Sequence, residues 1–231
     1  MPSDDAGLPL ILLDLDGTLV DSRGMIVRVA QVAAREIGLP VPEENAIANI
    51  IGLSLEPAMA KLYPDHGPED YARLAAAYRT EALRIRDTHE DIEALFEGAR
   101  DAVAELRAAG YMLGIATGKA RRGALHFCTR YGMEGWFDTI QTPDTNPSKP
   151  HPGMIESALA ETGALPHRTI MIGDTVYDLE MARNAGVFGV GVTWGNHSPD
   201  DLETAAPHHI VGAMNDLPRV VAELLEQGTH P

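Results

Sequence analysis

Short apolar runs alternate with helical patterns over most of this chain, and this alternation constrains its fold most. Each run predicts a short strand, and each stretch between two runs has apolar residues at helical spacing. Strands that alternate with helices build a parallel sheet with helices on both faces. The expected strands are 10–15, 111–117, 137–141, 169–174, 187–193 and 208–212, and the helices between or after them are 98–110, 120–132, 151–163, 177–186 and 214–228.

The stretch that follows the first expected strand breaks this alternation. Between residue 20 and about residue 95 we find only helical patterns, at 24–37, 53–63 and 68–85. This stretch is therefore expected to be an all-helical insertion, residues 20–95, in an α/β core formed by residues 1–19 and 96–231. The chain is long enough for both parts to bury a core.

Composition excludes several classes of function. The formal net charge is -16, which argues against nucleic acid and anionic membranes as partners, because both require a basic surface. No apolar run reaches the roughly 20 residues of a membrane span. The single cysteine, Cys128, cannot form an internal disulfide and is expected to be a buried thiol. The start of the chain is acidic and lacks the basic region of a signal peptide, so we expect a cytoplasmic protein.

Charged and hydroxyl side chains follow the ends of three expected strands. Ligands of open α/β sheets bind beyond the carboxyl ends of the strands, so these side chains should meet at one edge. Carboxylates at the end of a buried apolar strand are costly to bury unless they are paired or bind a metal. The candidate residues are Asp14, Asp16, Thr117, Gly118, Lys149, Asp174 and Asp178.

Each candidate has an ordinary structural interpretation when it is taken alone. Thr117 and Asp174 are both typical of helix caps, and Lys149 alone would usually be solvated. Asp14 and Asp16 could begin a calcium loop, but the glycine and glutamate that such a loop needs are absent at the required spacing. The occurrence of all these residues at consecutive loop positions favours a shared chemical role.

Together the candidates predict phosphoryl transfer. Asp14 would attack phosphorus as the nucleophile, and Asp16 would act first as general acid and then as general base. Mg²⁺ bound by Asp14, Asp174 and the backbone carbonyl of Asp16 would remove the repulsion between carboxylate and phosphate. Lys149 would neutralise further charge, and the Thr117 hydroxyl with nearby backbone N–H groups would bind phosphate oxygens.

The sequence resembles the haloacid dehalogenase superfamily. Four motifs occur in order, "DLDGT", the threonine of "IATGK", the lysine of "SKPHP" and "GDTVYD". The resemblance implies a Rossmann-like parallel sheet and a helical cap between the first and second motifs. It also implies the roles given above, with Gly118 beside Thr117 at the phosphate and Asp178 orienting Lys149 or a metal-bound water.

Members of this superfamily differ in their reactions. Dehalogenases and phosphonatases do not carry an acid at the position of Asp16, so its presence here favours hydrolysis of phosphate esters. The overall pattern looks most like phosphoglycolate phosphatase, which makes 2-phosphoglycolate the first candidate among small phosphorylated metabolites. A sugar-phosphate mutase similar to β-phosphoglucomutase is an alternative, and a non-catalytic phospho-binding or signalling protein is an alternative of another class.

Specificity should depend on the helical insertion. Residues 48–59 look like the cap loop that faces the active site in related enzymes, and Asn49 and Ser54 are its polar candidates for substrate contact. Both could equally be helix caps. The sequence leaves the oligomeric state open.

Overall fold

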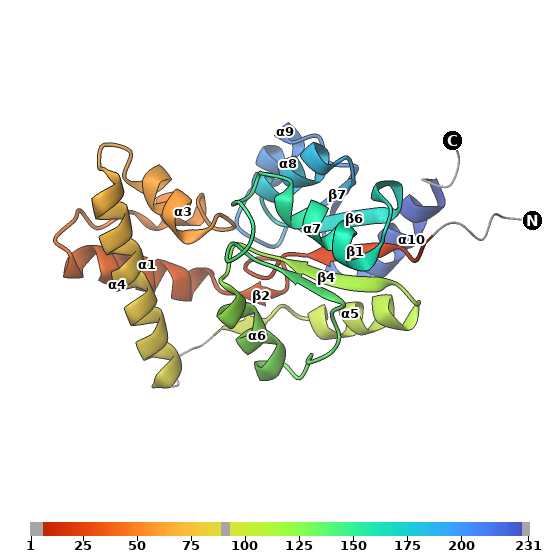
Figure 1. Cartoon of the computed structure of the whole chain (residues 1–231), viewed down its shortest axis with the longest axis horizontal. Coiled ribbons are helices and arrows are strands. Elements are labelled where there is room, and N and C mark those ends of the chain that lie inside the picture. The colour runs from red at the N-terminus through yellow and green to blue at the C-terminus, as the bar shows by residue number, and fades with distance from the viewer. Residues whose placement is uncertain (1–6, 89–92, 228–231) are drawn as a thin grey trace, which may run out of the picture.

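The centre of the molecule is a parallel sheet of six strands in the order β5-β4-β1-β6-β7-β8 (Figure 1). The computed structural model describes residues 7–88 and 93–227. In the middle of the sheet, Leu12 of β1 lies between Gly114 of β4 and Met171 of β6. The strands are β1 Leu10–Leu13, β4 Met112–Ala116, β5 Thr139–Gln141, β6 Thr169–Gly173, β7 Phe188–Val192 and β8 His209–Val211.

Helices cover both faces of this sheet because the central strands are apolar on both sides. In β1, Ile11 and Leu13 pack toward α5, α6 and α10, whereas Leu10 and Leu12 pack toward α7 and α8. Successive side chains of a strand point to opposite faces, which is why one short apolar strand contributes to two cores. The helices are α5 Ala99–Ala108, α6 Arg121–Arg130, α7 Gly153–Thr162, α8 Val176–Ala185, α9 Pro199–Thr204 and α10 Leu217–Gln227, with short 3-10 turns at Pro166–Arg168 and Met214–Asp216.

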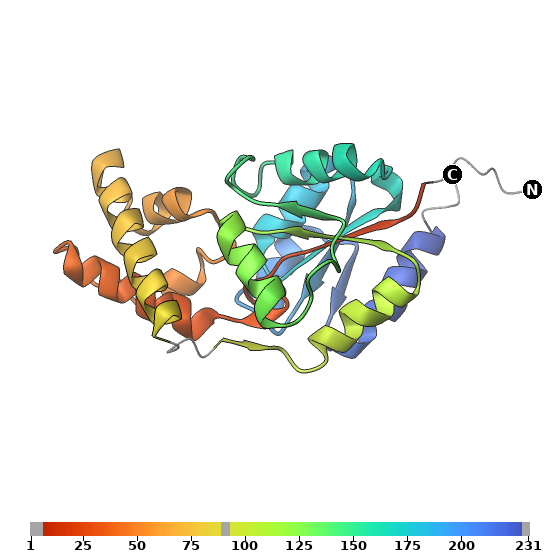
Figure 2. The same cartoon turned by 60° about the horizontal axis from the view of Figure 1, so that its bottom comes forward.

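Four helices lie together beyond the carboxyl ends of the sheet strands (Figures 1 and 2), and we call them the cap. They have a small core of their own, in which Ala33, Met59 and Leu74 are buried. The paired short strands β2 and β3 join the cap to the sheet. The elements are α1 Arg23–Glu36, α2 Glu44–Ala48, α3 Leu55–Leu62, α4 Pro68–Asp87, β2 Val20–Asp21 and β3 Ala94–Leu95.

This architecture confirms the fold expected from the alternating pattern, an α/β protein with a parallel sheet. Every strand and helix expected from the sequence is present. Four short elements, β2, β3, α2 and α9, were not expected. Elements of two to six residues contain too few side chains for a periodicity to show.

The division into a core of 1–19 and 96–231 and a cap of 20–95 stays a prediction. The pairing of Val20 with Leu95 brings the two expected boundaries side by side, which supports it. Part of the second expected linker, residues 89–92, lies outside the described residues. Within the described residues, no helix combines the length and the apolarity needed to cross a membrane.

Candidate active site

Three acidic side chains meet where β1 and β6 end. Asp14 directly follows β1, Asp174 directly follows β6, and Asp178 lies in the first turn of α8. One carboxylate oxygen from each lies within 4.8 Å of the others, and all three side chains are buried. The sheet brings them together because β1 and β6 are parallel neighbours.

Lys149 balances part of this charge. Its Nζ lies 3.0 Å from Oδ2 of Asp14 and 2.6 Å from Oδ1 of Asp178, and the residue is 1% exposed. Burial alone would lower the pKa of this ammonium group, but the attraction of the two carboxylates outweighs it and the pKa lies above its ordinary value. Lys149 is therefore a fixed positive charge beside Asp14.

Asp178 positions this lysine through the start of α8. Its Oδ2 accepts hydrogen bonds from the backbone N–H and the hydroxyl of Thr175, at 3.2 and 2.6 Å, so it closes a capping box. Its Oδ1 remains directed at Lys149. A Cβ at Gly173 would come within 2.1 Å of the Asp178 carboxyl carbon, which explains why a glycine ends β6.

The carboxylate of Asp174 is held on two sides. Thr18 donates its hydroxyl to Oδ1 at 2.9 Å, and Asn196 donates both its backbone and its side-chain N–H to Oδ2, at 2.8 and 2.9 Å. Gly17 has a positive φ of 82°, and a Cβ there or at Gly195 would come within 2.3 Å of Oδ2 of Asp174. Both loops therefore require glycine to approach this carboxylate.

The acidic cluster fits a divalent cation. The pKa of Asp14 is raised to about 8. Burial is the main cause of this rise, the neighbouring acids add to it, and Lys149 opposes it. Burial likewise raises the pKa of Asp174 to about 6, with Asp178 adding to the effect. Within the described residues, no hydrogen-bond donor apart from the Lys149 ammonium reaches the buried Oδ2 of Asp14. Oxygen ligands of this kind suit Mg²⁺, which would favour the ionised carboxylates.

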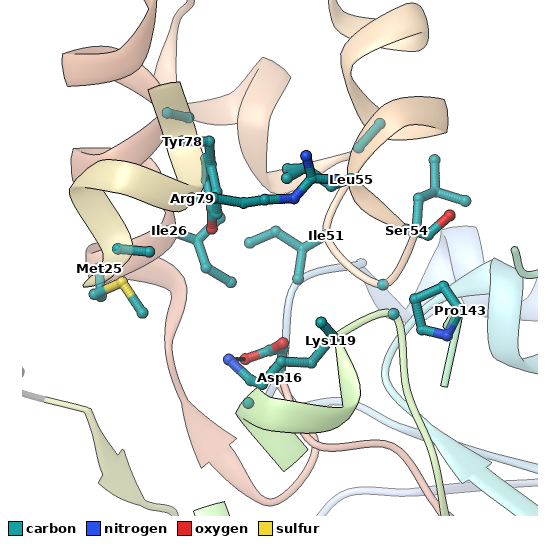
Figure 3. Close-up of a pocket in the computed structure, with 18 of the residues that line it drawn as sticks. Asp16, Met25, Ile26, Ile51, Ser54, Leu55, Tyr78, Arg79, Lys119 and Pro143 are labelled. Atoms are coloured by element: carbon teal, nitrogen blue, oxygen red, sulfur yellow. Dashed lines mark ion pairs between the residues drawn. The ribbon is translucent and has the colours of Figure 1, made fainter. Parts of the chain in front are cut away.

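Asp16 lies apart from this cluster, at the side of the cap. Its Oδ1 is 2.9 Å from Nζ of Lys119 (Figure 3). The same Nζ lies 3.7 Å from Oε1 of Glu93. Burial opposes the charge of Lys119, but the two carboxylates raise its pKa above the ordinary value. Sequence reasoning missed Lys119 as the partner of Asp16, and Glu93 as the second carboxylate that contacts Lys119. The position of Lys119 in the "TGK" stretch was a signal for the first, but nothing in the pattern around Glu93 pointed to this contact.

Thr117 and Gly118 lie next to Asp14, because β4 is the other neighbour of β1. Thr117 is buried, and its hydroxyl oxygen accepts a hydrogen bond from the backbone N–H of Lys119 at 3.3 Å. A Cβ at Gly118 would lie 2.6 Å from the carbonyl oxygens of both Gly52 and Leu53. The cap therefore rests directly on this loop of the core.

The two polar candidates from the cap have different positions. Ser54 lines a cavity that lies between the cap and the core. Its backbone N–H donates a hydrogen bond to Oγ of Ser148 at 2.9 Å. Asn49 is exposed and is absent from the described cavity lining, whereas its carbonyl oxygen accepts a hydrogen bond from Tyr177 at 2.7 Å. The structure thus places Ser54 at the cavity and gives Asn49 a contact between cap and core.

A family comparison agrees with this geometry. A family model for haloacid dehalogenase-like hydrolases matches residues 11–192 of the chain. The chain belongs to this family. The matched region runs from β1 to β7 and includes the cap, so it covers all four motifs that carried the resemblance.

Three curated relatives of this chain carry phosphatase or pyrophosphatase names. The chain is 35% identical over 227 residues to a probable phosphatase IndB of Dickeya dadantii (strain 3937), with 96% of this chain and 97% of that protein covered. It is 31% identical to a pyrophosphatase PpaX of Listeria monocytogenes serotype 4a (strain HCC23), covering 92% and 96%. A phosphoglycolate phosphatase of Nitrosococcus oceani is 27% identical, covering 93% and 96%. The chain is therefore a phosphatase-type hydrolase, as the motifs predicted.

Solved structures show the same fold. A predicted phosphatase from Clostridium acetobutylicum superposes with a TM-score of 0.84 at 23% identity, covering 94% of this chain and all of that one. A haloacid dehalogenase-like hydrolase from Streptococcus pneumoniae gives a TM-score of 0.79 at 28% identity, with 92% and 98% covered.

Proposed function

We propose that this protein is a Mg²⁺-dependent phosphatase that hydrolyses a small phosphorylated metabolite through an aspartyl-phosphate. One observation carries the proposal, the contact of the buried Asp14 with Lys149 beside Asp174 and Asp178. A nucleophilic carboxylate, a fixed positive charge and further hard oxygen ligands in one buried cluster suit attack on a phosphate dianion.

In the first half of the reaction, a carboxylate oxygen of Asp14 forms a bond to phosphorus and the ester oxygen leaves with the bonding pair. Asp16 donates a proton to that oxygen, which gives the free alcohol. In the second half, Asp16 takes a proton from water as the water oxygen bonds to phosphorus. The bond between phosphorus and Asp14 then breaks, which releases inorganic phosphate and restores both carboxyl groups.

The remaining residues of the site neutralise charge or bind the phosphate and the metal. Lys149 neutralises Asp14 and a phosphate oxygen, while the Thr117 hydroxyl and the Gly118 N–H donate to the other phosphate oxygens. Asp14, Asp174 and the backbone carbonyl of Asp16 would hold Mg²⁺, with Asp178 orienting Lys149. The metal would supply positive charge that offsets the repulsion between the carboxylates and the phosphate.

We test this function by measuring phosphate release from a panel of phosphate esters that includes 2-phosphoglycolate, the candidate that the sequence pattern suggests. Inorganic pyrophosphate, an anhydride, is added because of the pyrophosphatase relatives. Turnover should require Mg²⁺, stop in excess chelator and be inhibited by Ca²⁺, whose larger coordination number could engage both oxygens of the nucleophile. Full activity in chelator would contradict the proposal.

The same assay separates the alternatives. A sugar-phosphate mutase would convert its substrate to an isomer with little free phosphate, and a phospho-binding protein would give no turnover. The buried free thiol of Cys128 supports a reducing, cytoplasmic location for the enzyme.

A further inference from the structure

A cavity of about 660 Å³ lies between the cap and the core, on the side of the site where an alcohol would leave. Its core side includes Asp16, Gly118 and Lys119, whereas Asp14 is not part of its lining. The proposed general acid thus borders the cavity and the nucleophile lies deeper. A phosphate at Asp14 would direct its alcohol into this space.

Most of the residues that line the cap side of the cavity are apolar. Ile26 of α1 and Ile51 of the loop after α2 extend toward the ion pair of Asp16 and Lys119 (Figure 3). Met25 of α1, Leu55 of α3 and the ring of Tyr78 of α4 complete this wall. The polar and charged residues on the same side are Ser54, Glu56, Arg79 and Arg86. Four parts of the cap therefore supply one largely apolar surface, although the chain as a whole is strongly acidic.

The charged groups nearest the reacting atoms already face opposite charges. Lys119 lies between Asp16 and Glu93, at 2.9 and 3.7 Å. On the cap, Arg79 contacts Glu56 at 3.7 Å and its side chain is 58% exposed. Arg122, which is exposed, and Arg86, which is half-buried, also line the cavity. A short acidic alcohol such as glycolate would have to compete with Asp16 and Glu93 for Lys119, or with Glu56 for Arg79.

Resting on the proposed phosphatase function, we propose that the cavity binds the alcohol part of a phosphate monoester whose body is apolar, an alkyl chain or ring of several carbons. Cavities of about 300–1,000 Å³ hold ligands of drug size, so a two-carbon acid leaves most of this one unused. Each methylene buried against the cap should contribute about 0.8 kcal/mol, which is about a fourfold gain in kcat/KM.

The test compares straight-chain alkyl phosphates from ethyl to hexyl with 2-phosphoglycolate, by phosphate release in Mg²⁺. We expect kcat/KM to rise about fourfold with each added methylene until the cavity is full. 2-Phosphoglycolate should lie near ethyl phosphate. Hydrolysis of ethyl phosphate with no rise along the series, or the highest kcat/KM for 2-phosphoglycolate, would overturn this inference and leave the phosphatase function intact. No hydrolysis of any ester would overturn both.

Two variants on α1 test which residues cause the gain in kcat/KM per methylene. Ile26→Gln places an amide at the apolar wall and should reduce the gain per methylene to less than about twofold. Val27→Gln is the matched control, because Val27 is half-buried on α1 but does not line the cavity. It should keep the wild-type gain. Thermal melts confirm that both variants are folded. An equal gain in kcat/KM per methylene in both variants would contradict the proposal that Ile26 contacts the apolar part of the substrate.

Discussion

At the scale of single residues, Asp14 has two different carboxylate oxygens. Oδ1 accepts the backbone N–H of Leu15 at 2.7 Å, and Oδ2 faces Lys149 at 3.0 Å. The orientation of the nucleophile is therefore fixed before any substrate binds. Burial raises the pKa of this carboxyl group and Lys149 opposes the rise. A bound cation would favour the ionised form further.

The first prediction separates the two aspartates of the first motif. Asp14→Asn should abolish turnover, because an amide is close in shape but cannot form the phospho-enzyme. Asp16→Asn should slow phosphate release by roughly 10²–10⁴-fold, the usual contribution of general acid–base catalysis. The measurement is kcat with the best ester of the panel. Asp21→Asn, at an exposed position of β2, is the control and should keep wild-type activity.

Substantial turnover by Asp14→Asn would rule out the covalent route, and equal losses in both aspartate variants would assign them to one shared role. A melting curve for each protein shows that the losses are chemical and not due to unfolding.

At the scale of elements, the stretch 49–54 connects the cap to α8 and to two loops of the core. The carbonyl of Asn49 accepts a hydrogen bond from the hydroxyl of Tyr177 in α8, and the N–H of Ser54 donates to Ser148. A Cβ placed on Gly52 would lie 3.1 Å from Oγ1 of Thr175, so the backbone of this stretch packs closely against that residue. Lids of this kind exclude water and complete a site when they close. The contacts with Ser148 and Thr175 lie next to Lys149 and Asp174, so the position of the cap is linked to the catalytic loops.

The second prediction tests this contact through the Ser54 amide. Ser148→Ala removes its acceptor, and a hydrogen bond contributes about 1 kcal/mol, so amide exchange at Ser54 should become about fivefold faster. Hydrogen–deuterium exchange measured residue by residue shows the change. Ser157→Ala is the control, since Ser157 donates to Asn146 in the same region of the core without touching the cap. Unchanged exchange at Ser54 would mean that the contact does not hold the cap.

The sequence could predict the core elements and the position of the acidic cluster for one reason. Strands of four or five apolar residues and helices of ten residues carry a periodicity, and the parallel sheet then brings Asp14 and Asp174 together without further information. The pairing of Lys119 with Asp16 and Glu93, and the hydrogen bonds from Asn196 to Asp174, depend on how loops from distant parts of the chain fold over one another. The exposure of Asn49 depends on the angle of α2, which no local pattern specifies.

At the scale of the whole molecule, two buried carboxyl groups of the site link the stability of the fold to pH. The pKa values of Asp14 and Asp174 are raised to about 8 and about 6 from 3.8. A carboxyl group with a raised pKa stabilises the folded state at low pH, and that contribution is lost as the pH rises through the folded-state value. The metal-free protein should therefore become less stable as the pH rises from about 7 to about 9, beyond the titration of ordinary histidines.

Magnesium should reverse this trend, and this is the third prediction. Mg²⁺ binds ionised carboxylates, so protons compete with it and its stabilisation grows with pH. At a hundred times its dissociation constant it should add about 2.7 kcal/mol, which corresponds to roughly 5–10 °C in melting temperature for a chain of this size. Melting curves at about pH 7 and pH 9, with Mg²⁺ or with chelator, measure both effects. Asp174→Asn should lose most of the Mg²⁺ increment, whereas Asp200→Asn, at an exposed position of α9, should keep it. If the increment were the same at both pH values, or survived in Asp174→Asn, the metal would be bound somewhere other than the buried cluster.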